Sequence, residues 1–425
     1  MNLKLGIEMH NFARKLWPLN RSLTGEGVRK TLRNISEHLP NLAIKSVPSG
    51  TKIFDWSVPK EWAVNEAYIV TPSGKRICNF SENNLHLLGY STPFVGELAL
   101  EQLKDHLYTL PEQPEAIPYV TSYYKERWGF CLSQNQFDTL ENGVYKVFID
   151  TKLFNGVLNY GELIIPGKSK KEVFLSTYVC HPSMANNELS GPTVVTFLGK
   201  WLDQTPKREF SYRIIFIPET IGSILYLSIN HKKMKQNIFA GYNVTCIGDN
   251  RAYSYLPSRN GTTISDDIAK HVLKWIDPNF VSYNWLDRGS DERQYCAPGI
   301  DLPIASISRT LYGQYPEYHT SLDNLEDVVT AEGLNGGYWA IRKALEAIEN
   351  NKKYKVTTLC EPQMSKRGLW PAGFTDEVRL ISDFISFCDG STSLLEIANK
   401  LNLPIWNLYD VVNNLKSHNL ITSNK

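Results

Sequence analysis

The sequence predicts an α/β protein whose main sheet is mostly parallel and covered by helices, with a small inserted α+β module and a helical tail. Three observations predict this architecture. From about residue 140, short apolar runs alternate with helical stretches, which is typical of buried parallel strands. Between residues 53 and 118, short strands and a proline-rich exit interrupt that pattern. After residue 366, three helical stretches follow one another.

The N-terminal part of the chain predicts two helices and then the inserted module. The helices cover residues 7–16 and 28–39, the second with apolar residues at helical spacing. The module, residues 53–118, predicts strands over 63–70, 76–80 and 85–90, a helix over 97–110 and an exit through prolines 111, 114 and 118. The main domain then comprises residues 1–52 and 119–365.

The main domain alternates strands and helices. Apolar strand-like runs lie at 145–149, 158–165, 173–179, 213–218, 242–247 and 303–308. Helical stretches lie at 189–202, 223–235, 264–275 and 331–350. Ligands in such folds bind beyond the carboxyl ends of the strands, so polar residues that directly follow these runs are the first candidates for a site.

The tail, residues 366–425, predicts helices over 378–388, 393–401 and 405–418, the last two joined by the tight link Asn402-Leu403-Pro404. This is a helix-turn-helix pattern. Its acidic and basic residues balance, whereas a nucleic-acid reader is basic. We therefore expect the tail to dock a protein partner or to form a homo-oligomer, and we do not expect it to bind nucleic acid.

The bulk composition excludes several classes of protein. The formal net charge is only +1, which gives no basis for binding nucleic acid or an anionic membrane. The first residues lack the apolar core of a signal peptide, and no stretch of about 18 apolar residues exists. The seven cysteines are scattered and form no Cys-x-x-Cys pair, which favours reduced thiols in the cytoplasm.

A histidine follows one of the predicted central strands. The run Ser176–Val179 ends at Cys180-His181-Pro182, and a polar loop then leads into a helix. A neutral imidazole at the carboxyl end of such a strand is a good zinc ligand. The alternative is a histidine that only hydrogen-bonds the backbone of its loop.

Two more segments place chemically active side chains in similar positions. Glu219 follows the next apolar strand and could act as a general base, the alternative being a helix-capping or solvated glutamate. His319 precedes Thr-Ser-x-Asp and the final long helix, and the alternative is an incidental histidine in a capping segment. Asp249 and the pair Asp291-Glu292 are weaker candidates, because by themselves they predict solvated loop carboxylates.

Taken together, these segments resemble the zinc aminopeptidases that use two neighbouring metal ions. In that family a histidine, an Asn-Asp-x-x-Ser-Gly loop, a Glu-Glu pair, an aspartate and a late Tyr-His-Thr segment follow one another. The matching positions here are His181, the loop 185–191, Glu219, Asp249 and His319.

Over nearly its full length the chain is similar to bacterial aminopeptidase-like proteins associated with polysaccharide biosynthesis. The segments that match are 21–25, 56–62, 128–131 and 180–183, together with the inserted module and a winged-helix-like tail.

Two departures from the family pattern concern the metal ligands. The position of the bridging aspartate is Asn187, a neutral amide, and the second glutamate of the Glu-Glu pair is Thr220. Losing one anionic bridge and one anionic ligand weakens a site for two cations. The resemblance therefore implies one zinc ion, with a second weak or absent. The implied ligands are His181, His319, Asn187 and Asp249.

The resemblance implies hydrolysis of an amide, with Glu219 as the catalytic general base and zinc activating water. The substrate would be a peptide, or an aminoacyl or N-acyl group on a sugar used in polysaccharide biosynthesis. The competing interpretation is a non-catalytic scaffold that binds metal or ligand on the same fold, which the changes at Asn187 and Thr220 favour. A DNA-binding regulator would rest on the tail alone.

Overall fold

The computed structural model describes residues 3–369 and 375–423 of the chain. The expected tail domain therefore includes positions, 370–374 and 424–425, that lie outside the described residues. The chain forms two compact units. The first comprises residues 1–265 and 280–339, and the second comprises residues 266–279 and 340–425. All candidate site residues belong to the first unit.

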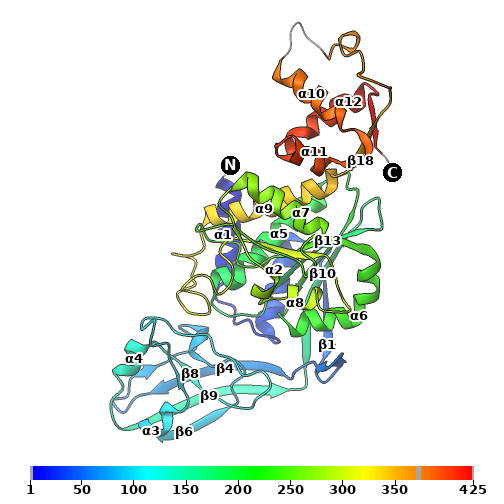
Figure 1. The fold of residues 1–425 in the computed structure, drawn as a ribbon. Helices are drawn as coiled ribbons and strands as arrows, with labels where there is room; N and C mark the ends of the chain where they lie inside the picture. The colour runs from blue at the N-terminus through cyan, green and yellow to red at the C-terminus, as the bar shows by residue number, and fades with distance from the viewer. Residues whose placement is uncertain (1–2, 370–374, 424–425) are drawn as a thin grey trace. The chain divides into compact units, whose positions relative to one another are not determined.

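An eight-stranded sheet forms the centre of the first unit (Figure 1). Its order is β1 (Ala43–Pro48), β10 (Val157–Ile165), β12 (Ser211–Ile217), β11 (Glu172–Tyr178), β13 (Ile238–Asn243), β16 (Ile304–Ser308), β14 (Ser254–Leu256) and β15 (Val281–Ser282). The four strands from β12 to β16 are parallel. Strands β1 and β10 pair antiparallel with their neighbours, and β14 is antiparallel to β16 but parallel to β15. The mostly parallel sheet is therefore confirmed. Strand β1 escaped prediction because it lies at the edge and is mostly exposed.

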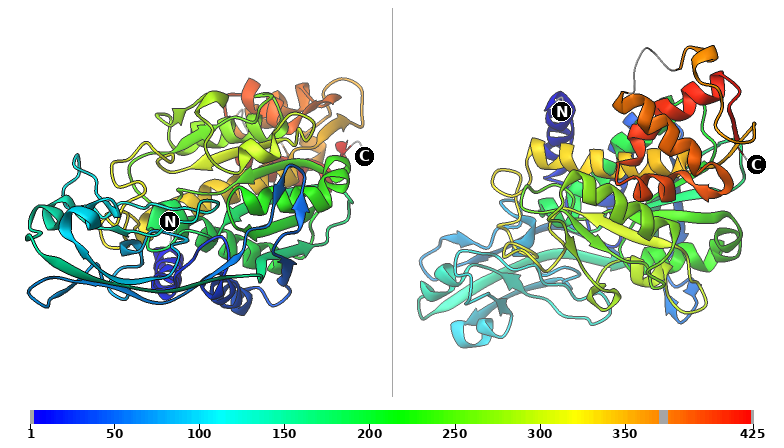
Figure 2. Two further views of the ribbon diagram at one scale, coloured as in Figure 1. Left: turned by 90° about the horizontal axis from the view of Figure 1, so that it is seen from below. Right: turned by 45° about the horizontal axis from the view of Figure 1, so that its top comes forward.

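Helices cover both faces of this sheet. Helices α1 (Leu3–Leu16), α2 (Glu26–His38) and α5 (Ser190–Gln204) pack together on one face, where the two blue N-terminal helices lie side by side in Figure 2. Ile214 of β12 contacts α5, whereas Ile217 contacts Gly222 of α6 (Ile221–Asn237). Because residues three apart on a strand point to opposite faces, α6 lies on the other side of the sheet.

The inserted module is built on a second, antiparallel sheet. Its order is β5 (Arg76–Ile77), β4 (Glu61–Val70), β9 (Val144–Phe154) and β6 (Phe94–Ala99). The long strand β9 alternates exposed and buried side chains, which is typical of an antiparallel sheet with one solvated face. The run at 145–149, expected in the central sheet, therefore belongs here. A strand beyond the expected boundary at residue 118 thus contributes to the module.

Two other local predictions in the module were wrong. Residues 85–90 do not form a strand, because Asn83 caps a short 3₁₀ turn, Asn84–His86, by accepting from the backbone N–H of Leu85. The predicted helix over 97–110 is reduced to α3 (Leu100–Lys104). Its first residues instead pair with β9 as part of β6. In both places a short local feature took the place of the longer element that composition favoured.

The second unit contains a three-stranded sheet of β18 (Asp389–Ser393), β17 (Lys353–Val356) and β19 (Ile421–Ser423). Helices α10 (Asp376–Ser386), α11 (Leu394–Lys400) and α12 (Tyr409–Ser417) complete a winged helix-turn-helix domain. The helices match the prediction for the tail, but strand β17 begins before residue 366. These strands are only three to five residues long, too short for a periodic pattern to reveal them in the sequence.

All seven cysteines are free thiols, and six of them are buried. Within the described ranges, no helix combines the length and the apolar character that crossing a membrane requires.

Candidate active site

The candidate site lies at one edge of the central sheet, beyond the carboxyl ends of its parallel strands. His181 follows β11 and Glu219 follows β12, and these two strands are neighbours in register. His319 lies in the long connection after β16, which is parallel to β13. Residues widely separated in the sequence therefore meet at one sheet edge, as the fold class predicts.

The His181 imidazole is held by a buried carboxylate. Its Nδ1 lies 3.0 Å from Oε2 of Glu188, which is fully buried in the π-helical turn Ala185–Leu189. On the other edge of the ring, Nε2 lies 3.6 Å from Oε2 of Glu219. A carboxylate that accepts from Nδ1–H fixes the tautomer and leaves the Nε2 lone pair for a metal.

Glu188 is in turn paired with a buried arginine. Arg21 is only 1% exposed, and its Nε lies 3.3 Å from Oε1 of Glu188. The same Nε–H donates to the backbone oxygen of His181 at 3.1 Å. Burial alone would lower the pKa of His181, but the hydrogen bond and charge of Glu188 outweigh it and raise that pKa. Sequence reasoning missed Glu188, whose only indication was its place in the loop before α5.

Replacing Glu188 by glutamine should weaken both the fold and the metal site. The buried Arg21 would lose its counter-charge, which costs about 3–5 kcal/mol of unfolding free energy. Loss of the partner that orients His181 should also lower zinc affinity by roughly 10–100-fold. Urea unfolding and zinc titration measure the two effects.

Glu172→Gln is the matched control for this substitution. Glu172 forms another buried ion pair, with Arg213, remote from the histidines along the same strand β11. The Glu172→Gln variant should lose about as much unfolding free energy as Glu188→Gln and should keep the zinc affinity of the wild type. Equal loss of zinc affinity in both variants would show that Glu188 acts only through general stability.

Glu219 is held by Ser290 and by a strained turn. The Ser290 hydroxyl donates to Oε1 of Glu219 at 2.7 Å, and the side chain of Glu219 remains 22% exposed. Thr220 has a φ of 62° and a ψ of −75°, and the backbone N–H of Ile221 donates to the oxygen of Glu219 at 2.7 Å. These angles define the rare classic γ-turn, which is strained for a β-branched residue such as threonine. Strained backbone of this kind occurs most often at functional sites.

Electrostatics around Glu219 favour exchange of a proton. Burial raises the pKa of Glu219, although the charge of His181 and the hydrogen bond from Ser290 act in the opposite direction. Burial, reinforced by the charge of Glu219, also raises the pKa of Asp291 to about 8. Two neighbouring acidic groups whose pKa values are both raised are typical of an acid–base site.

The acidic loop after β15 does not consist of solvated carboxylates, as the sequence had suggested. Asp291 and Glu292 are both fully buried. Glu292 accepts hydrogen bonds from the backbone N–H groups of Gly289 and Ser290 and from the hydroxyl of Tyr312. The loop is therefore a rigid structure that presents the Ser290 hydroxyl to Glu219. Asp249, for which the sequence had also suggested solvent exposure, is likewise only 1% exposed.

His319 comes close to His181 and is unprotonated. The two rings have centroids 5.7 Å apart, and Tyr119 lies edge-on to both at 5.2 Å. The ring of Tyr318 stacks on His319 at 3.9 Å. Burial, with the charge of His181, lowers the pKa of His319 to about 3. A neutral imidazole at this position suits a metal ligand.

Asn187 lies in the same π-helical turn as Glu188. Its Oδ1 accepts from the hydroxyl of Tyr178 at 3.0 Å, and its backbone N–H donates to Asp323 at 2.9 Å. An amide oxygen carries two lone pairs, so one lone pair of Oδ1 is not used by Tyr178. Asn187 therefore stays a candidate ligand, held in place by neighbours that the sequence did not indicate.

The carboxylate of Asp249 is occupied by four hydrogen bonds. Its carboxylate accepts hydrogen bonds from the side chain of Asn186, the backbone N–H of Arg251, and both the backbone N–H and the hydroxyl of Thr310. Among the described residues, no contact of this carboxylate involves His181 or His319. These hydrogen bonds stabilise the loops around Asp249. Asp249 could bind a metal only if its carboxylate broke some of them.

The position of the missing second glutamate carries a cation instead. The hydroxyl of Thr220 accepts from Nη2 of Arg293 at 2.7 Å, and its backbone N–H donates to Asp291. A guanidinium fixed at this point repels a second metal ion. The contact puts a positive charge where the family pattern has a second glutamate.

A second possible set of metal ligands shares His181 with the candidate site. The ligand atoms of Cys180, His181 and Glu188 all lie within 4.8 Å of one another, and all three residues are buried. Burial raises the pKa of the Cys180 thiol well above its ordinary value, and Glu188 already pairs with Arg21. A protonated thiol and a neutralised carboxylate are poor ligands. The open side of His181, at Nε2, is the better metal position.

The fold and this arrangement define an aminopeptidase-like protein. A zinc aminopeptidase from Bacillus subtilis shares the fold, with a TM-score of 0.57 at 14% identity over 81% of this chain and 94% of that one. A peptidase M28 precursor from Shewanella amazonensis has a TM-score of 0.57 at 12% identity, over 84% and 97% of the two chains. At these identities the likeness concerns the fold alone.

Closer relatives define the family. Residues 10–351 match the family described as a domain of unknown function (DUF4910), and residues 352–423 match a winged helix-turn-helix family. The chain belongs to the DUF4910 family. It is 43% identical to a Clostridium acetobutylicum protein, over 93% of this chain and 91% of that protein. That relative is provisionally named a polysaccharide biosynthesis protein with an aminopeptidase-like domain.

A crystal structure from Clostridium acetobutylicum, provisionally described as a peptidase, covers nearly the whole chain. It has a TM-score of 0.94 at 41% identity, over 99% of this chain and 97% of that one. The expected resemblance to bacterial aminopeptidase-like proteins, over nearly the full length and including the winged-helix tail, is therefore confirmed.

Proposed function

We propose that this protein is a zinc-dependent amide hydrolase of aminopeptidase type that uses one metal ion. The observation that carries the proposal is the pairing of Glu188 with Nδ1 of His181, which directs Nε2 towards Glu219 at 3.6 Å. This carboxylate–histidine arrangement is typical of zinc ligands.

The donor set fits zinc. His181 and His319 offer imidazole nitrogens, and the amide oxygen of Asn187, which follows β11 in the same loop as His181, is the proposed third ligand. Nitrogen and oxygen donors of this kind suit zinc. Zinc bound there supplies a Lewis acid that polarises the scissile carbonyl and makes water acidic enough to react near neutral pH.

The side chains of the chain itself perform the proton transfers. Glu219 accepts a proton from the attacking water and delivers it to the leaving amine. Ser290 fixes one carboxylate oxygen of Glu219, so the other, Oε2, faces His181. The ring of Tyr119 contacts both histidines, and the ring of Tyr318 stacks on His319.

The proposed substrate carries an amide bond, either in a peptide or in an aminoacyl or N-acyl group on a sugar. The name of the Clostridium acetobutylicum relative associates that protein with polysaccharide biosynthesis, and we propose the same setting here. Seven free thiols favour a reducing compartment, so we place the reaction in the cytoplasm. We assign the winged helix-turn-helix domain to docking or self-association.

The competing function is a scaffold that binds metal or ligand without catalysis. The neutral Asn187 and the Arg293–Thr220 contact favour it, because both weaken the two-ion site of the zinc aminopeptidases. The strained turn at Thr220 opposes it, since a scaffold has no need of a strained backbone beside Glu219.

A hydrolysis screen decides between the two functions. Protein purified without added metal should be incubated with aminoacyl amides, dipeptides and N-acetylated amino sugars. We expect one of these substrate classes to be hydrolysed, activity to disappear with a chelator, and added zinc to restore it. Absence of turnover on all classes with zinc bound would favour the scaffold.

A further inference from the structure

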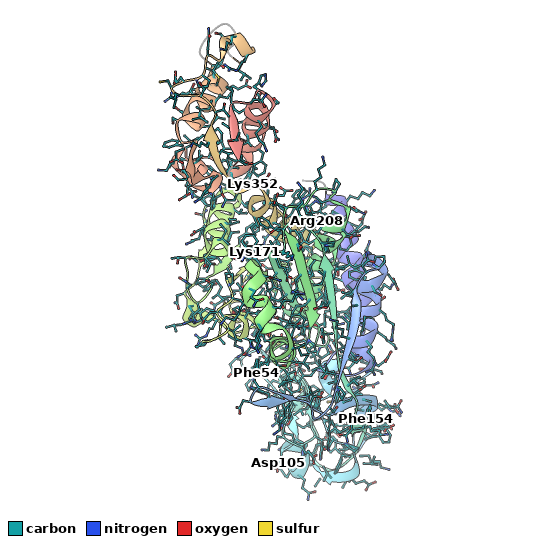
Figure 3. All side chains as sticks on the ribbon, turned by 90° about the vertical axis from the view of Figure 1, so that its right-hand side faces the viewer. Phe54, Asp105, Phe154, Lys171, Arg208 and Lys352 are labelled. Carbon is teal, nitrogen blue, oxygen red and sulfur yellow. The ribbon has the colours of Figure 1, made fainter. Side chains whose placement is uncertain are left out.

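A cavity opens in the part of the first unit where the inserted module joins the central sheet. Its volume is about 340 Å³, within the range of small-molecule sites. Three loops line it, around residues 49–60, 122–126 and 153–155. Figure 3 labels Phe54 and Phe154, which belong to two of these segments and mark where they run, near the junction of the two sheets.

The wall of this cavity combines aromatic faces with neutral polar groups. Tyr123 and Tyr124 line it together with Ser57 and Asn155. Tyr124 is 58% exposed, and its ring lies edge-on to the exposed ring of Trp56 at 5.9 Å. Aromatic faces bind the apolar C–H face of a flat ligand, whereas hydroxyl and amide groups bind its polar edge.

The charges of the cavity nearly cancel. Lys60 and Glu126 both line it and pair across it, with Nζ and Oε1 4.0 Å apart, which leaves Lys125 as the remaining lining charge. A site for a nucleotide or a polyphosphate would require several converging cations. The ligand that fits is neutral, polar along its edges and apolar on its faces, which describes a sugar ring.

The cavity is connected to the catalytic histidines by two tyrosines. The hydroxyl of Tyr123 lies 2.7 Å from the hydroxyl of Tyr119, and the Tyr119 ring contacts both His181 and His319. Tyr123 and Tyr119 therefore lie between a ligand in the cavity and the histidines of the candidate site.

We propose that this cavity binds one sugar ring of a saccharide substrate, and that the amide bond cleaved at the histidines belongs to an acylated amino sugar further along the same saccharide. The identity of the substrate rests on the proposed hydrolase function, but binding of the sugar does not. The proposal selects the sugar over the plain peptide among the candidate substrates.

Calorimetric titration with N-acetylglucosamine and its β-1,4-linked disaccharide tests the proposal on the full-length Glu219→Gln variant, which binds without turnover. We expect saturable binding, tighter for the disaccharide. Tyr124→Ala should weaken it by about tenfold, since one exposed aromatic face is lost. Tyr68→Ala is the matched control, because Tyr68 stacks on Phe148 in the smaller sheet and does not line the cavity. It should bind as tightly as its parent.

The outcomes separate this inference from the proposed function. No binding of either sugar, or equal affinity in the parent and in Tyr124→Ala, would overturn the sugar site. Tight binding of adenosine diphosphate that Tyr124→Ala abolishes would overturn it in favour of an anion site. Sugar binding that responds to Tyr124, in a wild-type protein that hydrolyses no amide, would support the site and overturn the proposed hydrolase.

Discussion

Replacing Glu219 by glutamine should lower hydrolysis by roughly 10²–10⁴-fold and leave zinc binding unchanged. Glutamine keeps the size of the side chain and can still accept the hydrogen bond from Ser290, but it cannot take a proton from water. Turnover and zinc content should be measured on the same preparation, because the expected result is the loss of one with retention of the other.

Glu317→Gln is the matched control for this variant. Glu317 lies two residues before His319 but pairs with Arg251, away from the proton path, so turnover should persist. The pH dependence of the wild type provides a second check. Hydrolysis should fall at acid pH as Glu219 becomes protonated. Because burial raises the pKa of Glu219, the midpoint of this fall should lie above the ordinary glutamate value of 4.5. Full turnover in Glu219→Gln would exclude Glu219 as the base.

The double substitution of His181 and His319 by alanine should remove the metal. The two imidazoles are the nitrogen donors of the site, and Asn187 alone cannot retain zinc. Zinc bound after dialysis should fall from about one ion per chain to none, and hydrolysis should fall with it.

His271→Ala provides the comparison for the double variant. His271 accepts from the backbone N–H of Ile405 and contacts Asn399 within the second unit, so it is a packing residue. Its loss should cost stability and leave zinc content unchanged. Retention of zinc by the His181/His319 double variant would place the metal elsewhere, with Cys180 and Glu188 as the first alternative.

Strand-end residues were predictable from the sequence because the fold fixes where they meet. An apolar run that ends in a histidine or a glutamate reveals both the strand and the side chain at its carboxyl end. His181 and Glu219 were identified on this basis, and His319 from its loop before the final helix and from the family resemblance. The structure brings all three together. The central sheet was recognised from the same runs.

The surroundings of the site were not predictable in the same way. Arg21 reaches Glu188 across 167 positions of the chain, and Ser290 reaches Glu219 across 71. No local pattern encodes such pairs, and a carboxylate in a polar loop looks solvated until its buried partners are seen. Asp249 and Glu292 were misjudged for this reason, since backbone N–H groups of distant or neighbouring loops satisfy their oxygens.

The central claim is that one zinc ion binds between His181 and His319. The most direct test is calorimetric titration of zinc into wild-type protein that was purified without metal and treated with a chelator. We expect a single tight site of about one ion per chain, lost in the His181→Ala/His319→Ala variant. Two equally tight ions would contradict the one-ion site, and no binding with excess zinc would contradict the zinc-dependent hydrolase.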